Sequence, residues 1–386
     1  MQNFDYTIVG FGLSGMLMAL EMSKNEWFAN KKIAIVEKDS KNSNDRTWCF
    51  WEKDQGDFES IVFKKWQNAF VGNEQYAKNY SLHPYQYKMI RGLDFYDFVK
   101  KQLSAQQNFT FIQDRVREII VQPNIIQIIG EQQTFESTIV LDSLFNAKPI
   151  ENQFQFPYLK QHFIGWFIKT KTPIFDDTSV KFMDFTIPQK GNTRFMYVLP
   201  TSTTEALFEY TLFSEKLLEK EEYENEIKIY LNQNQITDYE IIEKEQGNIP
   251  MTSFPFSKDN TRHYIKIGTA GGWTKASTGF TFNKSLKISK KLSAFLTNEK
   301  PLFEFNLESR YSWYDMILLE VLYQHNEKGG AIFSTLFHKN SVESIFEFLN
   351  EEGSFLKDFK LMNTMQKWIF IKALLKSLQK KYFLKR

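Results

Sequence analysis

Residues 6–22 read YTIVGFGLSGMLMALEM, and this stretch decides the fold class. The apolar residues 6–9 predict a buried strand, a G-x-G-x-x-G motif follows at Gly10, Gly12 and Gly15, and residues 16–22 have the apolar spacing of a helix. A strand, this motif and a helix in that order are typical of a dinucleotide-binding unit. Gly10 allows the tight turn, Gly12 lets the backbone approach a pyrophosphate, and Gly15 lets the helix pack closely on the strand. The helix N-terminus, with its free N–H groups, favours the phosphates.

A second strand is predicted at residues 32–36 and ends in Glu37, 22 residues after Gly15. A carboxylate at this position can accept hydrogen bonds from ribose hydroxyls. It would repel a 2′-phosphate, so the pattern favours FAD over NADP. The alternative reading of the glycines alone is a turn that binds nothing.

A second glycine-rich segment follows a short strand at residues 265–272 and continues through residues 275–282. Its small residues, among them Gly268, Gly271, Gly272, Thr278 and Gly279, would let the backbone come close to a flat ligand. Backbone N–H groups in such a loop can also bind an anion. A loop without a ligand is the alternative for this segment.

The composition excludes several classes of protein. Of 386 residues, 42% are hydrophobic and 24% are charged, which excludes a collagen-like or disordered chain. The single cysteine, Cys49, rules out an intrachain disulfide and a multi-cysteine metal cluster, and the five histidines show no metal-ligand spacing, so no metal site is predicted. Aromatic residues reach 16%, which indicates apolar pockets, a membrane-facing surface or simply a Phe-rich core.

The basic charge gathers at one end of the chain. Residues 366–386 hold seven basic side chains and no acidic one, while the formal net charge of the whole chain is only +2. This asymmetry argues against a broad nucleic-acid-binding face and is compatible with an anionic lipid surface. As a helix, this tail would place Lys372, Lys376 and Lys380 on one stripe and apolar residues roughly opposite, namely Trp368, Ile371, Leu374, Leu375, Leu378 and Tyr382. A docked helix with a solvated lysine face is the alternative.

No apolar run reaches the roughly 18 residues that span a bilayer, and residues 1–5 lack the basic start of a signal peptide. We therefore expect a cytoplasmic protein that is peripherally attached to the inner face of the cell membrane.

Alternating apolar and polar residues between 163 and 213 predict a second, antiparallel sheet, and the chain beyond residue 311 is predicted to be mostly helical. The sequence thus predicts an α/β (α+β) protein with four consecutive parts. These are a Rossmann-like FAD-binding part at 1–150 with a substrate-side insert near 51–85, an antiparallel-sheet substrate domain at 151–250, the second FAD-binding part at 251–300, and a helical C-terminal region with a basic tail at 301–386.

Over nearly its whole length the chain resembles the bacterial-type lycopene beta-cyclases, an FAD-dependent family of carotenoid cyclases. The order and spacing of several segments carry this resemblance: the Gly10–Gly15 motif, RTWCFW at 46–51, MDF at 183–185, RFMYVLP at 194–200, ALFEYT at 206–211, IPMT at 249–252, the loop at 268–282, and Arg310, Tyr311 and Asp315. Ala276 and the Ser143-Leu144 pair depart from patterns common in related flavoproteins, which affects the expected flavin contacts more than the resemblance.

The resemblance implies a fold of the glutathione-reductase/hydroxylase type and a redox-neutral, acid-initiated cyclisation of lycopene through γ-carotene to β-carotene. It implies FAD in its reduced form, with NAD(P)H as reductant, and as partners lycopene, γ-carotene and a membrane lipid surface, with no nucleic acid and no metal. The predicted cofactor-binding residues are Gly10, Gly12, Leu13, Ser14, Gly15, Glu37, Lys38, Arg46, Trp48, Arg91, Gly268, Gly271, Gly272, Thr278 and Gly279.

Glu209 is the predicted catalytic acid–base residue. On a strand at 206–213 its same-face neighbours are Leu207 and Thr211, and an apolar setting raises the pKa of a carboxyl. The resemblance places the family's catalytic glutamate at this position. A strand glutamate that pairs with a lysine or faces water is the alternative. Asp184 is the second candidate, which could orient Glu209, remove the final proton or cap a turn.

Aromatic rings can stabilise a carbocation, and Trp48, Phe50, Trp51, Phe208 and Trp273 are candidates for this role as well as for plain packing. Two rival functions remain at this stage. One is an FAD-dependent hydroxylase or desaturase acting on a hydrophobic isoprenoid, and the other is a non-catalytic flavin- and carotenoid-binding membrane protein. The sequence also leaves open whether Glu209 or reduced flavin gives the first proton, and whether one or both ends of the substrate cyclise.

Overall fold

The first layer of the protein is a seven-stranded sheet in the order β8-β2-β1-β11-β10-β9, with β17 paired to β11. The computed structural model describes residues 2–383, with side chains as far as residue 378. Five strands of this sheet run parallel: β1 (Asn3–Val9), β2 (Ile33–Glu37), β8 (Phe109–Gln113), β11 (Thr134–Asp142) and β17 (Tyr264–Lys266). The strands β9 (Val116–Val121) and β10 (Ile126–Gly130) form an antiparallel edge.

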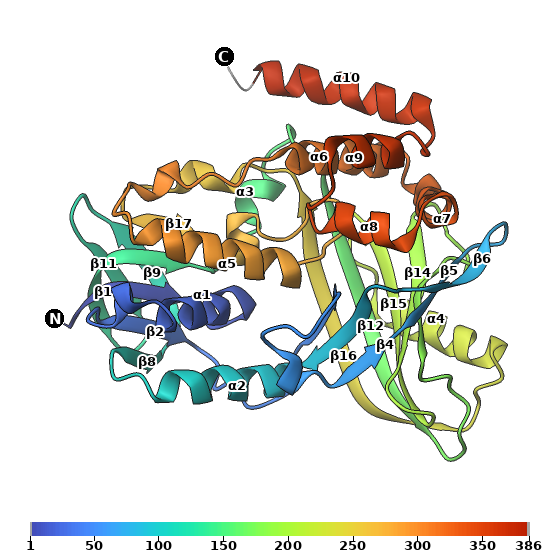
Figure 1. Ribbon diagram of the computed structural model, residues 1–386, viewed down its shortest axis with the longest axis horizontal. Helices are drawn as coiled ribbons and strands as arrows, with labels where there is room; N and C mark the ends of the chain where they lie inside the picture. The colour runs from blue at the N-terminus through green and yellow to red at the C-terminus, as the bar shows by residue number, and fades with distance from the viewer. Residues whose placement is uncertain (1, 384–386) are drawn as a thin grey trace.

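Three helices pack on this sheet and on one another: α1 (Leu13–Ser23), α2 (Gly92–Ser104) and α5 (Phe282–Leu296) (Figure 1). The succession β1, α1 and β2 confirms the strand–motif–helix–strand order predicted from residues 6–37. The helix α2 begins at Gly92, directly after Ile90 and Arg91, which end the strand β7 (Gln86–Arg91).

The second layer is another seven-stranded sheet, in the order β16-β12-β15-β14-β13-β5-β6. Its strands are β16 (Tyr239–Thr252), β12 (Tyr158–Thr170), β15 (Glu205–Ser214), β14 (Thr193–Pro200), β13 (Ser179–Asp184), β5 (Asn68–Gly72) and β6 (Ala77–Ser81). All neighbours pair antiparallel except β13 and β5, which are parallel. A small third sheet, made of β3 (Thr47–Glu52), β7 and β4 (Lys64–Trp66), contributes Trp48 and Cys49 to the site described below.

Helices cover both faces of the second sheet. The helix α4 (Lys220–Gln233) packs on the face that carries Trp166, Met196 and Phe208. The opposite face meets helices from the C-terminal third of the chain, which lie over the junction of the two layers (Figure 1). These helices are α6 (Arg310–Gln324), α7 (Gly329–Lys339), α8 (Val342–Leu349), α9 (Phe355–Met362) and α10 (Lys367–Phe383), and the short α3 (Lys148–Glu151) precedes β12.

His162 on β12 is buried on the α4 side of this sheet. Its Nε2 lies 2.7 Å from the Ser214 hydroxyl and its Nδ1 lies 2.5 Å from the Tyr223 hydroxyl. Burial lowers the pKa of His162 to about 4. The folded protein therefore holds this imidazole neutral at pH values where the unfolded chain, with a histidine pKa of about 6.5, has already bound a proton.

The protein should therefore lose stability in acid through His162. The unfolded state binds the extra proton, so the contribution of His162 to the free energy of unfolding is fully present above pH 7. It is lost as the pH falls from about 6.5 to about 4, and the total loss is about 3 kcal/mol. Urea unfolding of the wild type and of His162→Gln at pH 7 and pH 4.5 measures it. The variant should be less stable at pH 7 but lose less stability between the two pH values, and equal losses in both proteins would contradict the assignment.

Candidate functional site

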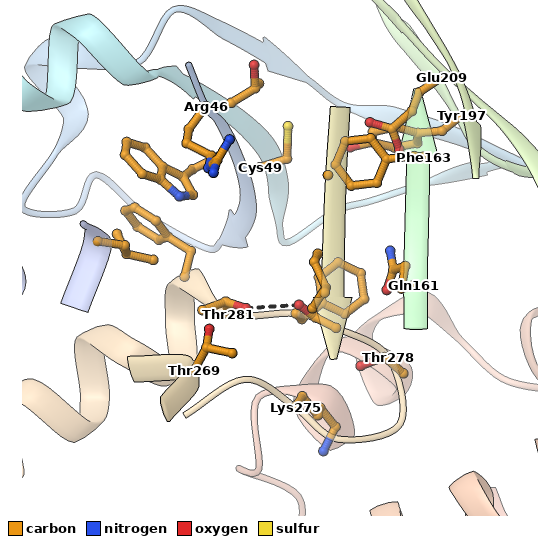
Figure 2. A pocket seen from close by; sticks show the side chains of 18 of the residues that line it. Arg46, Cys49, Gln161, Phe163, Tyr197, Glu209, Thr269, Lys275, Thr278 and Thr281 are labelled. Atoms are coloured by element: carbon orange, nitrogen blue, oxygen red, sulfur yellow. Dashed lines mark hydrogen bonds between the residues drawn. The ribbon is translucent and has the colours of Figure 1, made fainter. Parts of the chain in front are cut away.

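One cavity of about 620 Å³ extends from the start of α1 to the inner face of the second sheet. Both glycine-rich segments, the third sheet, the second sheet and helices α6–α8 contribute to its wall. Figure 2 shows Glu209 and Tyr197 at one end of this cavity, and Thr269, Thr278 and Thr281 at the other. Segments that are far apart in the sequence thus meet around a single space.

The G-x-G-x-x-G motif forms one end of the cavity. A Cβ atom on Gly15 would lie 2.0 Å from the backbone oxygen of Gly10, so a side chain here would push α1 away from the turn. A Cβ atom on Gly12 would meet no atom within 4 Å, because Gly12 faces the open cavity together with Leu13 and Ser14. The motif therefore presents bare backbone and a helix N-terminus to whatever occupies the cavity.

The second glycine-rich segment forms the adjoining wall. Gly268, Thr278 and Gly279 line the cavity, and the Thr281 hydroxyl donates a hydrogen bond to the Gly279 carbonyl oxygen at 2.9 Å (Figure 2). Next to them Lys275 is buried, with its Nζ 2.9 Å from a carboxylate oxygen of Asp315 on α6. This ion pair fixes the loop to the helical region.

Glu209 lies at the far end of the cavity, on β15. It is 7% exposed, and the hydroxyl of Thr211 donates a hydrogen bond to its Oε1 at 2.5 Å. Burial, and next the charge of the neighbouring Glu245, raise the pKa of Glu209 well above its usual value. A protonated carboxyl is therefore available in a largely apolar space near neutral pH.

Weakly acidic groups surround this carboxyl. The hydroxyls of Tyr87 and Tyr197 lie 2.6 Å apart, and Tyr197 is paired in register with Glu209 on the adjacent strand. Burial raises the pKa of the Cys49 thiol to about 12 and raises the pKa of both tyrosines. All three groups are neutral at pH 7, so Cys49 is no thiolate nucleophile and Glu209 is the acid best placed to give up a proton.

The profile of the lycopene cyclase protein family matches residues 5–368, which is nearly the whole chain. The chain belongs to this family. The resemblance found in the sequence motifs is thereby confirmed. No curated protein sequence is similar enough to the chain to match it.

Several solved structures have the same fold. A flavoprotein/dehydrogenase from Cytophaga hutchinsonii aligns over 98% of this chain and 100% of its own, with a TM-score of 0.60 and 13% identity. A geranylgeranyl bacteriochlorophyll reductase-like protein from Thermoplasma acidophilum aligns over 100% and 99%, with a TM-score of 0.58 and 11% identity. A tryptophan halogenase from Shewanella frigidimarina aligns over 99% and 95%, with a TM-score of 0.59 and 11% identity. At these identities the likeness shows the fold, and it confirms the predicted fold class.

Some predicted cofactor residues of this lycopene cyclase family member lie beside the cavity rather than in its wall. The Glu37 carboxylate accepts hydrogen bonds from the backbone N–H groups of Phe11, at 2.7 Å, and Asp39, at 3.0 Å. Lys38 is exposed next to Asp39. Arg46 and Trp48 lie in the cavity wall. Four of the predicted glycines belong to the two glycine-rich loops but do not line the cavity: Gly10, Gly15, Gly271 and Gly272.

Arg91 has a different position from the one expected of a cofactor ligand. Its Nη2 lies 2.5 Å from Glu243 Oε1 and 2.6 Å from Glu243 Oε2, and its guanidinium stacks on the ring of Phe167, 4.3 Å from the centroid. These contacts join the end of β7 to the second sheet. The sequence could not reveal them, because Arg91 and Glu243 are 152 residues apart.

Asp184 lies on the opposite face of the second sheet from Glu209. It accepts hydrogen bonds from the Thr186 hydroxyl at 2.6 Å, the Thr186 N–H at 3.1 Å and the Tyr230 hydroxyl of α4 at 2.6 Å. An irregularity in the pairing of β13 between Lys181 and Asp184 turns Phe182 and Met183 toward the cavity and Asp184 away from it. Of the roles considered, these contacts are those of a turn cap, and Asp184 does not reach Glu209 as a catalytic partner would.

Glu245 is the site residue that the sequence reasoning missed. It lies on β16, a strand absent from the sequence-based expectations, and it lines the cavity beside Glu209. The inward positions of β16 include Glu243, Glu245 and Gly247, so the strand lacks the apolar alternation that marks a half-buried strand. Ile241 does not continue this inward series, because the pairing with β12 is irregular between Phe167 and Ile168 and Ile241 packs on the α4 side.

Proposed function

We propose that the protein is a lycopene beta-cyclase, which closes the linear ends of lycopene into β-ionone rings through γ-carotene to β-carotene. One observation carries this proposal: Glu209, a buried carboxyl with a raised pKa, lies in the cavity that the two glycine-rich loops also line. A cyclisation that begins with protonation of an alkene needs an acid of this kind in a space without water. Membership of the lycopene cyclase family supports the same substrate class.

FAD is the cofactor that fits the glycine-rich end of the cavity. The open approach at Gly12 and the N-terminus of α1 suit a pyrophosphate, and Glu37 lies at the end of β2 beside that turn. Backbone near Gly268, Thr278 and Gly279 would hold the flat ring system. When bound in its reduced form, with NAD(P)H as the reductant, FAD supplies an electron-rich ring that stabilises nearby positive charge.

The protein's own residues would carry the proton transfers. Glu209 gives its proton to the terminal double bond of the substrate, which leaves a tertiary cation, and the neighbouring double bond closes the ring onto it. Loss of a ring proton then completes a reaction with no net change in redox state. Leu199, Leu207 and Phe182 line the cavity around the carboxyl and would exclude the water that would quench the cation.

Expression in cells that accumulate lycopene tests the function. We expect the red pigment to change to orange-yellow, with a product of unchanged mass and the retention time of β-carotene. A product heavier by one oxygen would instead indicate a hydroxylase, and unchanged lycopene beside a flavin-loaded protein would indicate a binding protein.

We further propose that α9 and α10 bind the protein to a membrane surface, where lycopene is dissolved. The face of α10 that contacts α6 carries the half-buried Ile369 and Phe370 and the buried Ala373 and Ser377, and Lys376 pairs with Glu320 at 2.7 Å. The solvent-facing side of the two helices also carries large apolar residues, and the exposed fractions of their side chains are 64% for Phe355, 78% for Leu356, 54% for Phe359, 79% for Trp368, 43% for Ile371, 56% for Leu375 and 44% for Leu378. Exposed lysines accompany them at 360, 367 and 372.

This combination suits a headgroup layer of anionic lipid better than water. Trp368, Ile371, Leu375 and Leu378 of the predicted apolar face are exposed, whereas Lys376 of the predicted lysine stripe pairs with Glu320 of α6. Of the predicted tail residues, Lys385 and Arg386 lie outside the described residues, as do the side chains of Lys380, Lys381 and Tyr382. None of the helices within residues 2–383 is both long and apolar enough to cross a bilayer.

In a co-sedimentation assay, the double variant Trp368→Glu/Leu375→Glu should bind anionic phosphatidylglycerol vesicles with an affinity at least about tenfold lower than that of the wild type. The reason is that it removes two apolar side chains from the proposed membrane-binding surface. Its folding should be unaffected, since both side chains are exposed. The matched control is Ile229→Glu on α4, an exposed apolar residue far from α10 (Figure 1). Equal vesicle binding by all three proteins would contradict the proposed surface.

A further inference from the structure

Two carboxyl groups meet at the far end of the cavity because a glycine separates their strands. In the register of the second sheet, Gly165 of β12 is paired with Glu209 of β15 on one side and with Glu245 of β16 on the other. A Cβ atom on Gly165 would lie 3.1 Å from Glu245 Cγ and 3.5 Å from Glu209 Cβ. Since Gly165 has no side chain, no side chain of β12 separates the two glutamates, and the charge of Glu245 acts on Glu209 across that strand.

The surroundings of the two carboxyls are unequal. Burial, which is the largest influence, raises the pKa of Glu245 as well, but the Thr47 hydroxyl donates a hydrogen bond to Glu245 Oε2 at 2.8 Å, and the positive charges of Arg91 and Arg46 also favour its ionised form. Burial is also the main influence on Glu209 and opposes its ionisation. Among the described residues, the hydrogen bond from Thr211 is the contact that favours its ionised form. Two adjacent buried carboxyls do not both ionise near neutral pH, because the second charge is repelled by the first.

We propose that Glu209 and Glu245 form one proton-sharing carboxyl pair, in which Glu245 holds the negative charge and is the positioning residue that keeps the proton on Glu209. The inference rests on the proposed role of Glu209 as the acid of the cyclisation and deepens it. Thr47 and Gly165 are the two residues that make the pair possible: Thr47 steadies the charged partner and Gly165 leaves room for the contact.

The carboxyl pair can donate the proton that starts the cyclisation and accept the proton that the ring loses at the end. When the Glu209 O–H bond breaks and a C–H bond forms on the substrate, the pair changes from one negative charge to two, and the substrate becomes a cation. When a ring C–H bond breaks, its electron pair completes the new double bond and the proton returns to the pair. The charge on Glu245 makes Glu209 the stronger base for that return. No oxidant or reductant takes part in this balance.

The charge state of the pair depends on a small set of neighbours. Six titratable or charged side chains act on one or both carboxyls. They come from the third sheet and the loop before it (Arg46, Cys49, Tyr87 and Arg91), from β14 (Tyr197) and from β16 (Glu243). Cys49, Tyr87 and Tyr197 stay neutral because burial raises the pKa of each. Glu243 forms an ion pair with Arg91, and Glu245 is the only carboxylate among the described residues whose charge directly raises the pKa of Glu209.

The variant Glu245→Gln tests the pair, because it keeps the shape of the side chain and removes its charge. The infrared carbonyl band of a protonated carboxylic acid, followed against pH in the purified protein, reports Glu209 without any need for turnover. We expect the pH at which this band disappears to fall by at least about one unit in Glu245→Gln. The alkaline limit of cyclisation should fall by the same amount, with kcat in mildly acidic solution retained within a few-fold.

Three comparisons make the result decisive. Glu209→Gln should remove the band, which assigns the band to Glu209. Glu245→Asp, which keeps the charge, should restore much of the wild-type midpoint. Glu240→Gln, which changes an exposed carboxyl on the same strand as Glu245, should leave the midpoint unchanged. An unchanged midpoint in Glu245→Gln would overturn the pair. A shifted band in a protein that does not cyclise lycopene would support the pair and reject the proposed reaction, so the two ideas fail separately.

Discussion

Glu209→Gln should abolish ring closure while the protein still binds FAD. An amide cannot donate the proton that starts the reaction, and positioned acid catalysis contributes about 10²- to 10⁴-fold, so we expect kcat to fall by that factor. FAD binding should survive because Glu209 lies at the opposite end of the cavity from the glycine-rich loops (Figure 2). The substitution also preserves the size of a buried side chain, which limits the effect on folding.

The measurement is chromatographic analysis of carotenoids formed from lycopene in vesicles, together with the flavin absorbance of the purified variant. Glu205→Gln is the matched control, since Glu205 begins the same strand but pairs with Lys169 at the surface, 2.7 Å away. The control should cyclise lycopene at the wild-type rate. Turnover by Glu209→Gln within a few-fold of the wild type would remove Glu209 from the mechanism and leave the flavin as the source of the proton.

The second large effect concerns alanine substitutions at two glycines of the G-x-G-x-x-G motif. Gly12→Ala should weaken FAD binding alone, whereas Gly15→Ala should also destabilise the protein. In Gly12→Ala the new methyl group meets no protein atom within 4 Å, so the apoprotein should be as stable as the wild type. The methyl group projects into the space where the pyrophosphate would approach, so the affinity for FAD should fall by at least about tenfold. In Gly15→Ala the methyl group would lie 2.0 Å from the Gly10 backbone oxygen, so the whole turn must move and the apoprotein should lose about 1–3 kcal/mol of stability.

Thermal unfolding of the two apoproteins and titration with FAD separate these outcomes. The expected pattern is a wild-type melting temperature with weak FAD binding for Gly12→Ala, and a lowered melting temperature with weak FAD binding for Gly15→Ala. Normal FAD affinity in Gly12→Ala would contradict the assignment of this loop to the pyrophosphate.

The parts of the fold that the sequence predicted are those in which neighbouring residues make the structure. The β1–turn–α1–β2 succession depends on local patterns within residues 3–37, and each pattern is visible as apolar runs and glycines. Glu209 was also within reach of sequence reasoning, because a lone acid on a strand of apolar residues is conspicuous between Leu207 and Thr211.

The errors and omissions arose where a distant segment supplies the partner. The acids on the inner face of β16 hide that strand's alternation, and they are tolerated there because Arg91, Thr47 and the cavity meet them in the fold. Asp184 turns away from Glu209 because of one irregularity in strand pairing, and such an irregularity leaves no mark in the period of the sequence.

Taken alone, the sequence determined the dinucleotide-type turn, the presence of two sheets, the family, and the place of a carboxyl, Glu209, on a largely apolar strand, since these follow from residue types at short spacing. The tertiary structure alone decided which carboxyl stands next to Glu209, because Gly165, Glu209 and Glu245 come from three strands and meet only through the register of the sheet. It also decided which side of α10 faces outward, because Ile369, Phe370 and Ala373 pack in one cluster with residues of α6 and α7, while the opposite side of the helix stays exposed. Electrostatic and packing energies depend on distance in space, and a linear pattern does not contain that distance.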